Sequence, residues 1–122
     1  MAAALGLTAT VSTPTWNDHT YACTYGYPTG SFTLSVKELS SWPQTYAFYN
    51  SARVSDAPTE ALQNLGQAGF QGKGGVVVVR KEWKVLTVDV AGLPPQFGVP
   101  PTSADSVAVT VADVILACWA GD

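Results

Sequence analysis

The feature that most constrains the fold is a strict alternation of apolar and polar residues over positions 31–37. Its apolar members are Phe32, Leu34 and Val36. A period of two residues indicates a β-strand with one buried face. Residues 20–25 alternate in the same way, and the intervening Gly-Tyr-Pro-Thr-Gly segment predicts a turn. These two segments are therefore expected to pair as an antiparallel hairpin.

A second hairpin is predicted around the valine-rich segment at residues 76–79. Four successive β-branched residues indicate a central strand that is covered on both faces. Residues 85–90 alternate again, with Leu86, Val88 and Val90 on one side. A short polar turn at residues 81–84 joins the two strands.

Two helices are predicted, each beginning at a serine. Ser41 is a suitable N-cap for a middle helix over residues 43–53, and Ser103 for a final helix that ends at Gly121. One face of the final helix carries apolar residues at helical spacing, namely Val107, Val111, Val114, Ile115 and Cys118. Residues 61–65 suggest a further helical turn, and residues 66–75, with five glycines, suggest a turning connection.

These elements predict an α+β fold in one domain that spans residues 1–122. An antiparallel sheet of two hairpins packs against the C-terminal helix and a shorter middle helix, and we expect it to be covered on one face. A chain of 122 residues is long enough to bury one core of its own.

Charge and hydropathy exclude several classes of protein. Only 12% of the residues are charged, about half of the roughly 25% typical of soluble domains, whereas disordered chains show the opposite balance. The net charge is −3 and no basic stripe occurs, which argues against nucleic-acid binding. No apolar run approaches the roughly 18 residues of a membrane span.

No set of residues suitable for catalysis, cofactor binding or metal binding is found in the sequence. The glycine-rich segment lacks the spacing of a phosphate-binding loop. The nine carboxylates are scattered along the chain, and His19 is the single histidine. A hydrolase site that uses Asp18 and His19 would have to be assembled by the fold, and we rank it last among the functional hypotheses.

The two cysteines, Cys23 and Cys118, allow two interpretations. They are an even number and do not form a Cys-x-x-Cys motif, so a zinc site or a thioredoxin-like site is disfavoured. They can form a disulfide, as in many exported domains, or remain as two buried thiols that pack as small apolar groups.

The first residues, Met-Ala-Ala-Ala-Leu-Gly, lack the charged and apolar regions of a signal peptide. The Ala-Ala-Ala-Leu-Gly stretch is instead typical of a helix that ends at a glycine. We therefore expect the natural chain to begin upstream, with a signal or lipid-anchor segment there.

Aromatic residues provide the candidate binding surface. The set consists of Tyr25, Tyr27, Trp42, Tyr46, Tyr49 and Phe97. The densest group lies between residues 42 and 49, and the tyrosines of residues 25–27 are expected to lie across from it. Such clusters form apolar grooves or protein contacts, but the same residues are also typical of core packing.

Four short segments, spread over nearly the whole chain, support a resemblance. They are Ala-Ala-Ala-Leu-Gly at residues 2–6, Cys23-Thr24-Tyr25, Leu65-Gly66-x-Ala68-x-Phe70 before the valine-rich strand, and Ala117-Cys118-Trp119. Together they resemble small lipoproteins and secreted domains of actinobacterial cell envelopes. The resemblance implies export, anchoring through an upstream lipidated cysteine, and a Cys23–Cys118 disulfide. It implies no enzymatic activity and no catalytic residue.

Two functional hypotheses follow from the sequence and the resemblance. The first is a non-enzymatic accessory or protein-binding domain, located outside the cytoplasm within an envelope or membrane protein complex. The second is a carrier of a small apolar ligand or lipid fragment, held in a groove between the sheet and a helix. Neither hypothesis requires a cofactor.

Overall fold

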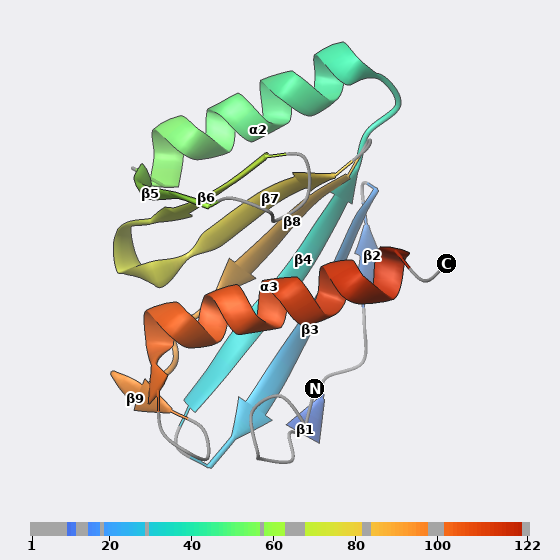
Figure 1. The fold of residues 1–122 in the computed structure, drawn as a ribbon. Coiled ribbons are helices and arrows are strands. Elements are labelled where there is room, and N and C mark those ends of the chain that lie inside the picture. Colours follow the sequence, from blue (N-terminus) through green and yellow to red (C-terminus); the bar gives the residue numbers. More distant parts are fainter. Residues whose placement is uncertain are drawn as a thin grey trace.

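The strands of the chain form an antiparallel sheet with a helix on each face (Figure 1). The computed structural model describes residues 10–11, 15–17, 19–28, 30–56, 58–62, 68–81, 84–97 and 102–120. Within these ranges, the described side chains exclude those of residues 16–17, 55–56, 58–62, 73 and 116–120.

Both predicted hairpins are confirmed. The first consists of β3 (Thr20–Tyr27) and β4 (Gly30–Glu38), and the second of β7 (Val77–Lys81) and β8 (Lys84–Asp89). Pairing of β4 with β8 joins them into one sheet with the strand order β1-β3-β4-β8-β7-β6-β5, and β2 also pairs with β3. The remaining strands of this sheet are β1 (Thr10–Val11), β2 (Thr15–Asn17), β5 (Pro58–Leu62) and β6 (Ala68–Gly72).

The two helices are α2 (Trp42–Asp56) and α3 (Ala104–Ala120). The prediction of an α+β fold with a middle and a C-terminal helix is confirmed, but the expected coverage of one sheet face is wrong. Val77 and Val79 pack in the cluster with α3, whereas Val78 between them packs in the cluster with α2. Because neighbouring strand residues point to opposite faces, the helices lie on opposite sides of the sheet. The valine strand is therefore covered on both faces, as its sequence predicted.

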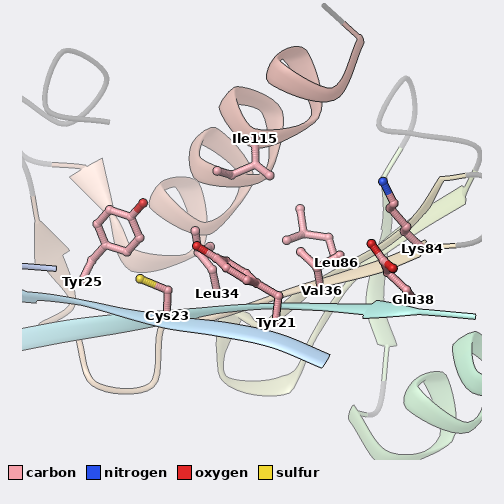
Figure 2. A pocket seen from close by; sticks show the side chains of 9 residues that line it. All are labelled: Tyr21, Cys23, Tyr25, Leu34, Val36, Glu38, Lys84, Leu86 and Ile115. Atoms are coloured by element: carbon pink, nitrogen blue, oxygen red, sulfur yellow. The ribbon is translucent and has the colours of Figure 1, made fainter. Parts of the chain in front are cut away.

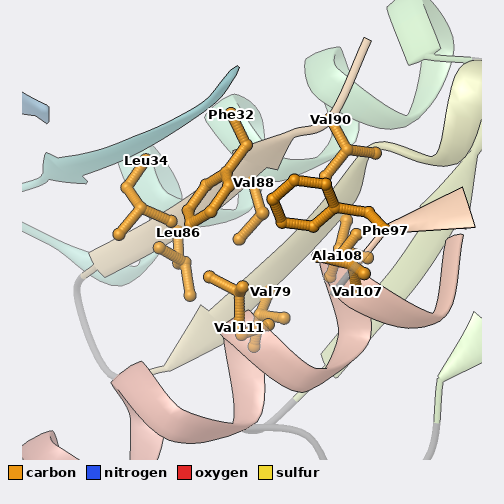
Figure 3. Packing of buried hydrophobic residues seen from close by; sticks show 12 residues of the cluster. Phe32, Leu34, Val79, Leu86, Val88, Val90, Phe97, Val107, Ala108 and Val111 are labelled. Carbon is orange, nitrogen blue, oxygen red and sulfur yellow. The ribbon is translucent and has the colours of Figure 1, made fainter. Parts of the chain in front are cut away.

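The larger core lies between the sheet and α3 (Figure 3). The predicted alternating residues Phe32 and Leu34 contribute from β4, while Leu86 and Val88 contribute from β8. From α3, the fully buried contributors are Val107, Ala108, Val111 and Ala112. The small alanines allow the helix to approach the sheet closely. Ile115, one turn further on, is only half-buried at the border of this core.

Both helices begin at the predicted serine caps. The Ser41 hydroxyl accepts a hydrogen bond of 3.4 Å from the Gln44 backbone N–H, and the Ser103 hydroxyl accepts one of 3.2 Å from the Ser106 N–H. These bonds satisfy N–H groups that have no partner inside the helix. The middle helix extends from the cap through Asp56, a few residues beyond the predicted end.

The predictions for residues 61–75 are wrong at residues 61–62 and 68–72, which are strands, while residues 63–67 lie outside the described residues. Instead of a helical turn and a turning connection, the described residues include β5 and β6, which pair with each other and extend the sheet beyond β7. The short 3-10 helix η1 (Lys73–Gly75) then leads into β7. Glycine has a low intrinsic strand propensity. The glycine-containing β6 is nevertheless stable because its backbone pairs with β5 and β7 and the side chain of Phe70 is buried.

Gln71 of β6 attaches this end of the sheet to the start of α3. Its side-chain Nε2 donates hydrogen bonds to the carbonyl oxygens of Gly75, at 3.1 Å, and Asp105, at 2.8 Å. Gly75 has a φ of +87°, and a Cβ there would lie 2.5 Å from Oδ1 of Asp105. Glycine is therefore required where η1 passes under the helix.

The loop between β8 and α3 forms a small hairpin of its own. Strands β9 (Gln96–Phe97) and β10 (Thr102–Ser103) pair immediately before the helix begins. Phe97 is buried in the α3 core, and its side chain attaches the described part of this loop to the domain.

Candidate functional site

A pocket lies between the sheet and the second half of α3 (Figure 2). Its walls come from β3, β4, β8 and α3. The lining residues are Tyr21, Cys23, Tyr25, Leu34, Val36, Glu38, Lys84, Leu86 and Ile115. The pocket adjoins the place where the tightly packed part of α3 gives way to the half-buried Ile115.

The alternation of the strands explains why these residues share the pocket. Every second residue of β3 from position 21 to 25, and of β4 from position 34 to 38, points to the α3 face. The strand register places Cys23 beside Leu34 and Tyr21 beside Val36. Ile115 closes the pocket from the helix side.

The size and walls of the pocket suit a small organic ligand. Its volume is about 310 Å³, at the lower end of the roughly 300–1,000 Å³ typical of ligand pockets. Cys23, Leu34 and Leu86 make its floor buried and apolar. Such a floor favours an apolar group over the water that it would displace.

The charged residues of the pocket lie together at one end. Glu38 and Lys84 are register partners on β4 and β8, and Figure 2 shows them at the end opposite Tyr25. Burial raises the pKa of the Tyr25 hydroxyl above its usual range, and the nearby Cys23 and Tyr21 raise it slightly further. Tyr25 is therefore neutral at pH 7 and can act as a hydrogen-bond donor.

The structure divides the predicted aromatic surface into two clusters on opposite faces of the sheet. Tyr25 and Tyr27 pack with the α3 core, and the middle-helix aromatics lie on the other side, so the expectation that they face each other is wrong. The alternation of β3 is the physical reason, since it directs both tyrosines to the α3 face. Tyr49 and Phe97 are buried, at 7% and 3% exposure, and contribute to packing instead of an exposed surface.

The cluster on the α3 face is a stack of rings beside the pocket. The ring centroids of Tyr25 and Phe32 lie 5.0 Å apart, and those of Tyr27 and Phe97 lie 4.8 Å apart at an edge-to-face angle of 70°. These geometries are the favoured ones for aromatic pairs. Burial raises the pKa of Tyr27, whose hydroxyl has no hydrogen-bond partner among the described residues.

The cluster on α2 is arranged around Arg80 of β7. The guanidinium carbon lies 4.7 Å from the ring centre of Tyr46, 5.8 Å from that of Trp42 and 5.9 Å from that of Tyr49. These distances are within the range of cation–π attraction. Trp42 and Tyr46 stack with centroids 5.8 Å apart and remain 39% and 47% exposed.

The two cysteines lie on elements that face each other across the pocket. Cys23 is buried on β3 and lines the pocket. Position 118 is on α3, three residues after Ile115, and residues three apart on a helix share a face. The side chain of Cys118 lies outside the described ones, so the disulfide stays a prediction.

Of the two residues of the hydrolase hypothesis, His19 has a backbone carbonyl oxygen that accepts a 2.8 Å hydrogen bond from the N–H of Glu38, at the charged end of the pocket. His19 is an exposed turn residue with a φ of +56°, and it does not line the pocket. Asp18 lies outside the described residues. Among the side chains that the structure describes, no group of three acidic, histidine or cysteine residues is placed to hold a metal ion.

Of the candidate surface residues, only Tyr25 lines the pocket; Cys23, predicted as a disulfide partner, lines it too. Sequence reasoning recognised the apolar face of β4 but assigned it wholly to the core. It missed Glu38 and Lys84, because their proximity depends on the pairing of β4 with β8. The one available signal was that position 38 continues the alternation of residues 32–36.

Comparisons with models of protein families, with curated proteins and with solved structures found no match. In the described part of the chain, neither helix combines the length and the apolar character needed to cross a bilayer.

Proposed function

We propose that this domain binds a small, largely apolar ligand in the pocket between the sheet and α3. The observation that best supports this proposal is a pocket of about 310 Å³ with an apolar floor, which is formed by regular strands and a helix. Sites of this kind are largely formed before the ligand arrives, which limits the entropic cost of binding. The proposal corresponds to the second hypothesis from the sequence, a carrier of a small apolar ligand, and it names the residues that would contact that ligand.

The composition of the pocket supports binding without catalysis. Among the described side chains, the titratable groups that line it are those of Tyr21, Cys23, Tyr25, Glu38 and Lys84. A hydrolytic site requires a nucleophile with a base in hydrogen-bond reach, but the strand register places Cys23 beside Leu34, four residues along β4 from Glu38. The domain would therefore carry or sense its ligand and leave it unchanged.

A pocket-filling substitution tests this proposal. Val36→Phe places a larger side chain in the pocket, and we expect it to weaken binding of 1-octanol by at least about tenfold while the fold is retained. Binding is measured by titration calorimetry, and folding by circular dichroism and thermal unfolding. The corresponding change Val54→Phe, at an 85% exposed position of α2, is the control and should leave binding unchanged.

A second variant, Ile115→Phe, fills the pocket from the helix side. It shows whether any loss of binding in Val36→Phe comes from filling the pocket or from a local distortion of β4. Both pocket variants should lose binding. If 1-octanol does not bind to the parent protein, or binds equally well to both filled variants, the proposal is overturned.

A second candidate function, contact with another protein in the cell envelope, is favoured by the exposed stack of Trp42 and Tyr46. Exposed tryptophan and tyrosine are enriched where proteins bind each other. The cation–π contacts to Arg80 hold this pair in place, so little side-chain entropy is lost when a partner covers it.

The protein-contact candidate predicts that the double variant Trp42→Ala, Tyr46→Ala loses a specific partner. The full natural chain, with any upstream segment, is extracted from membranes with and without cross-linking, and its bound proteins are identified. The partner should be reduced at least about tenfold in the double variant. It should be retained in Phe48→Ala, which truncates another exposed aromatic of α2. Recovery of the parent chain alone would contradict this candidate.

A further inference from the structure

The shape of the pocket defines the direction in which a ligand lies. The lining residues of β3 run from Tyr21 to Tyr25 and those of β4 from Leu34 to Glu38. Four residue steps along a strand correspond to about 13 Å. The pocket is therefore a trough that follows the strands, long enough for an extended chain of on the order of ten carbon–carbon bonds of about 1.5 Å each, projected on the axis.

The two ends of this trough differ in chemistry. Toward one end, Cys23 and Leu34 are each 5% exposed and Tyr25 is neutral. At the other end, Glu38 is exposed and Lys84 is half-buried, so this end meets solvent. An apolar tail is stabilised at the buried end, whereas a polar group remains hydrated only at the charged end.

We infer that the ligand is a single-chain amphiphile with a zwitterionic head group, bound with its head group at Glu38 and Lys84 and its tail directed along β4 toward Leu34. The inference rests on the proposed function. Binding of such an amphiphile requires an apolar surface as long as its tail and two opposite charges at the head-group end. The trough has both, and its two charged residues lie on the adjacent strands β4 and β8.

The paired charges explain why a zwitterion is favoured over a simple ion. Glu38 and Lys84 are opposite each other in the strand register. An anion that approaches the ammonium group of Lys84 also approaches the carboxylate of Glu38, so attraction and repulsion largely cancel. A zwitterion can place its cationic group near Glu38 and its anionic group near Lys84, and gains from both.

The experiment compares ligands that share an eight-carbon tail and differ in the head group. The zwitterions are octylphosphocholine and the octyl betaine of dimethylglycine. The first has the phosphate of a lipid head group and the second the carboxylate of an amino acid, so their affinities show which anionic group is preferred. The ions are octanoate and octyltrimethylammonium, and 1-octanol is the uncharged reference. We expect at least one zwitterion to bind about fivefold or more tightly than either ion at low salt.

Charge-removing variants then locate the head group. Glu38→Gln should raise the affinity for octanoate, and Lys84→Gln should raise that for octyltrimethylammonium, each by about threefold to tenfold. Asp113→Asn removes the same charge as Glu38→Gln from an exposed position of α3 that does not line the pocket, and should leave the order of affinities unchanged.

The outcomes separate the inference from the function on which it rests. If none of the octyl compounds binds, the proposed function fails. If all five bind equally, or octanoate binds more tightly than both zwitterions, the pocket binds apolar tails but the head-group inference is overturned. Unchanged preferences in both Glu38→Gln and Lys84→Gln would also overturn it.

Discussion

Reduction of the predicted Cys23–Cys118 disulfide is expected to lower the free energy of unfolding by roughly 4–5 kcal/mol. The bridge would close a loop of about 95 of the 122 residues. In the chain-entropy model, closing a loop of about 100 residues destabilises the unfolded chain by roughly this free energy. The structure places Cys23 on the α3-facing side of β3, and position 118 shares a helix face with the pocket residue Ile115.

The measurement is urea unfolding of the protein with and without reductant, together with intact mass. Protein made under oxidising conditions should gain two hydrogens on reduction. The double variant Cys23→Ser, Cys118→Ser should unfold at the same urea concentration in both conditions and serves as the control. Free thiols in the oxidised preparation would contradict the bridge and remove the main support for export.

Truncation of Phe32 to alanine is expected to cost about 3–5 kcal/mol of unfolding free energy. The side chain is 1% exposed, stacks on Tyr25 with ring centroids 5.0 Å apart, and lies 6.0 Å from the ring of Tyr27. Its removal leaves a cavity beneath both rings, and packed strands on either side limit how far the site can collapse.

The same substitution on the helix surface provides the control. Phe48 of α2 is 37% exposed, and Phe48→Ala should cost less than about 1 kcal/mol. Both variants are compared with the parent by urea unfolding monitored by circular dichroism. Equal losses in the two variants would show that Phe32 is not the core residue that the structure describes.

Local pattern was sufficient for the elements with strong periodicity. The alternation around Phe32 and Leu34 predicted β4 and its hairpin, because only a strand directs every second residue to one face. The serine caps were readable because Ser41 and Ser103 satisfy the backbone N–H groups of their own helices, an interaction within three residues.

Interactions between distant segments determined what local pattern could not predict. The residues of the glycine-containing β6 show little strand preference of their own. Pairing with β5 and β7, which are separate segments, stabilises this strand. The sequence also did not predict which face of the sheet each helix covers, because the valine strand has apolar residues on both faces. The division of the aromatic residues into two clusters follows from that choice.

The sequence by itself determined that this protein is an α+β domain with two hairpins and two capped helices, because these depend on neighbours within a few residues. Only the tertiary structure decided that there is a pocket and what lines it. Glu38 and Lys84 lie far apart in the chain and meet through the β4–β8 register, and Ile115 closes the trough from a third element. A binding site of this kind depends on how strands and helix are placed relative to one another, which no local residue pattern specifies.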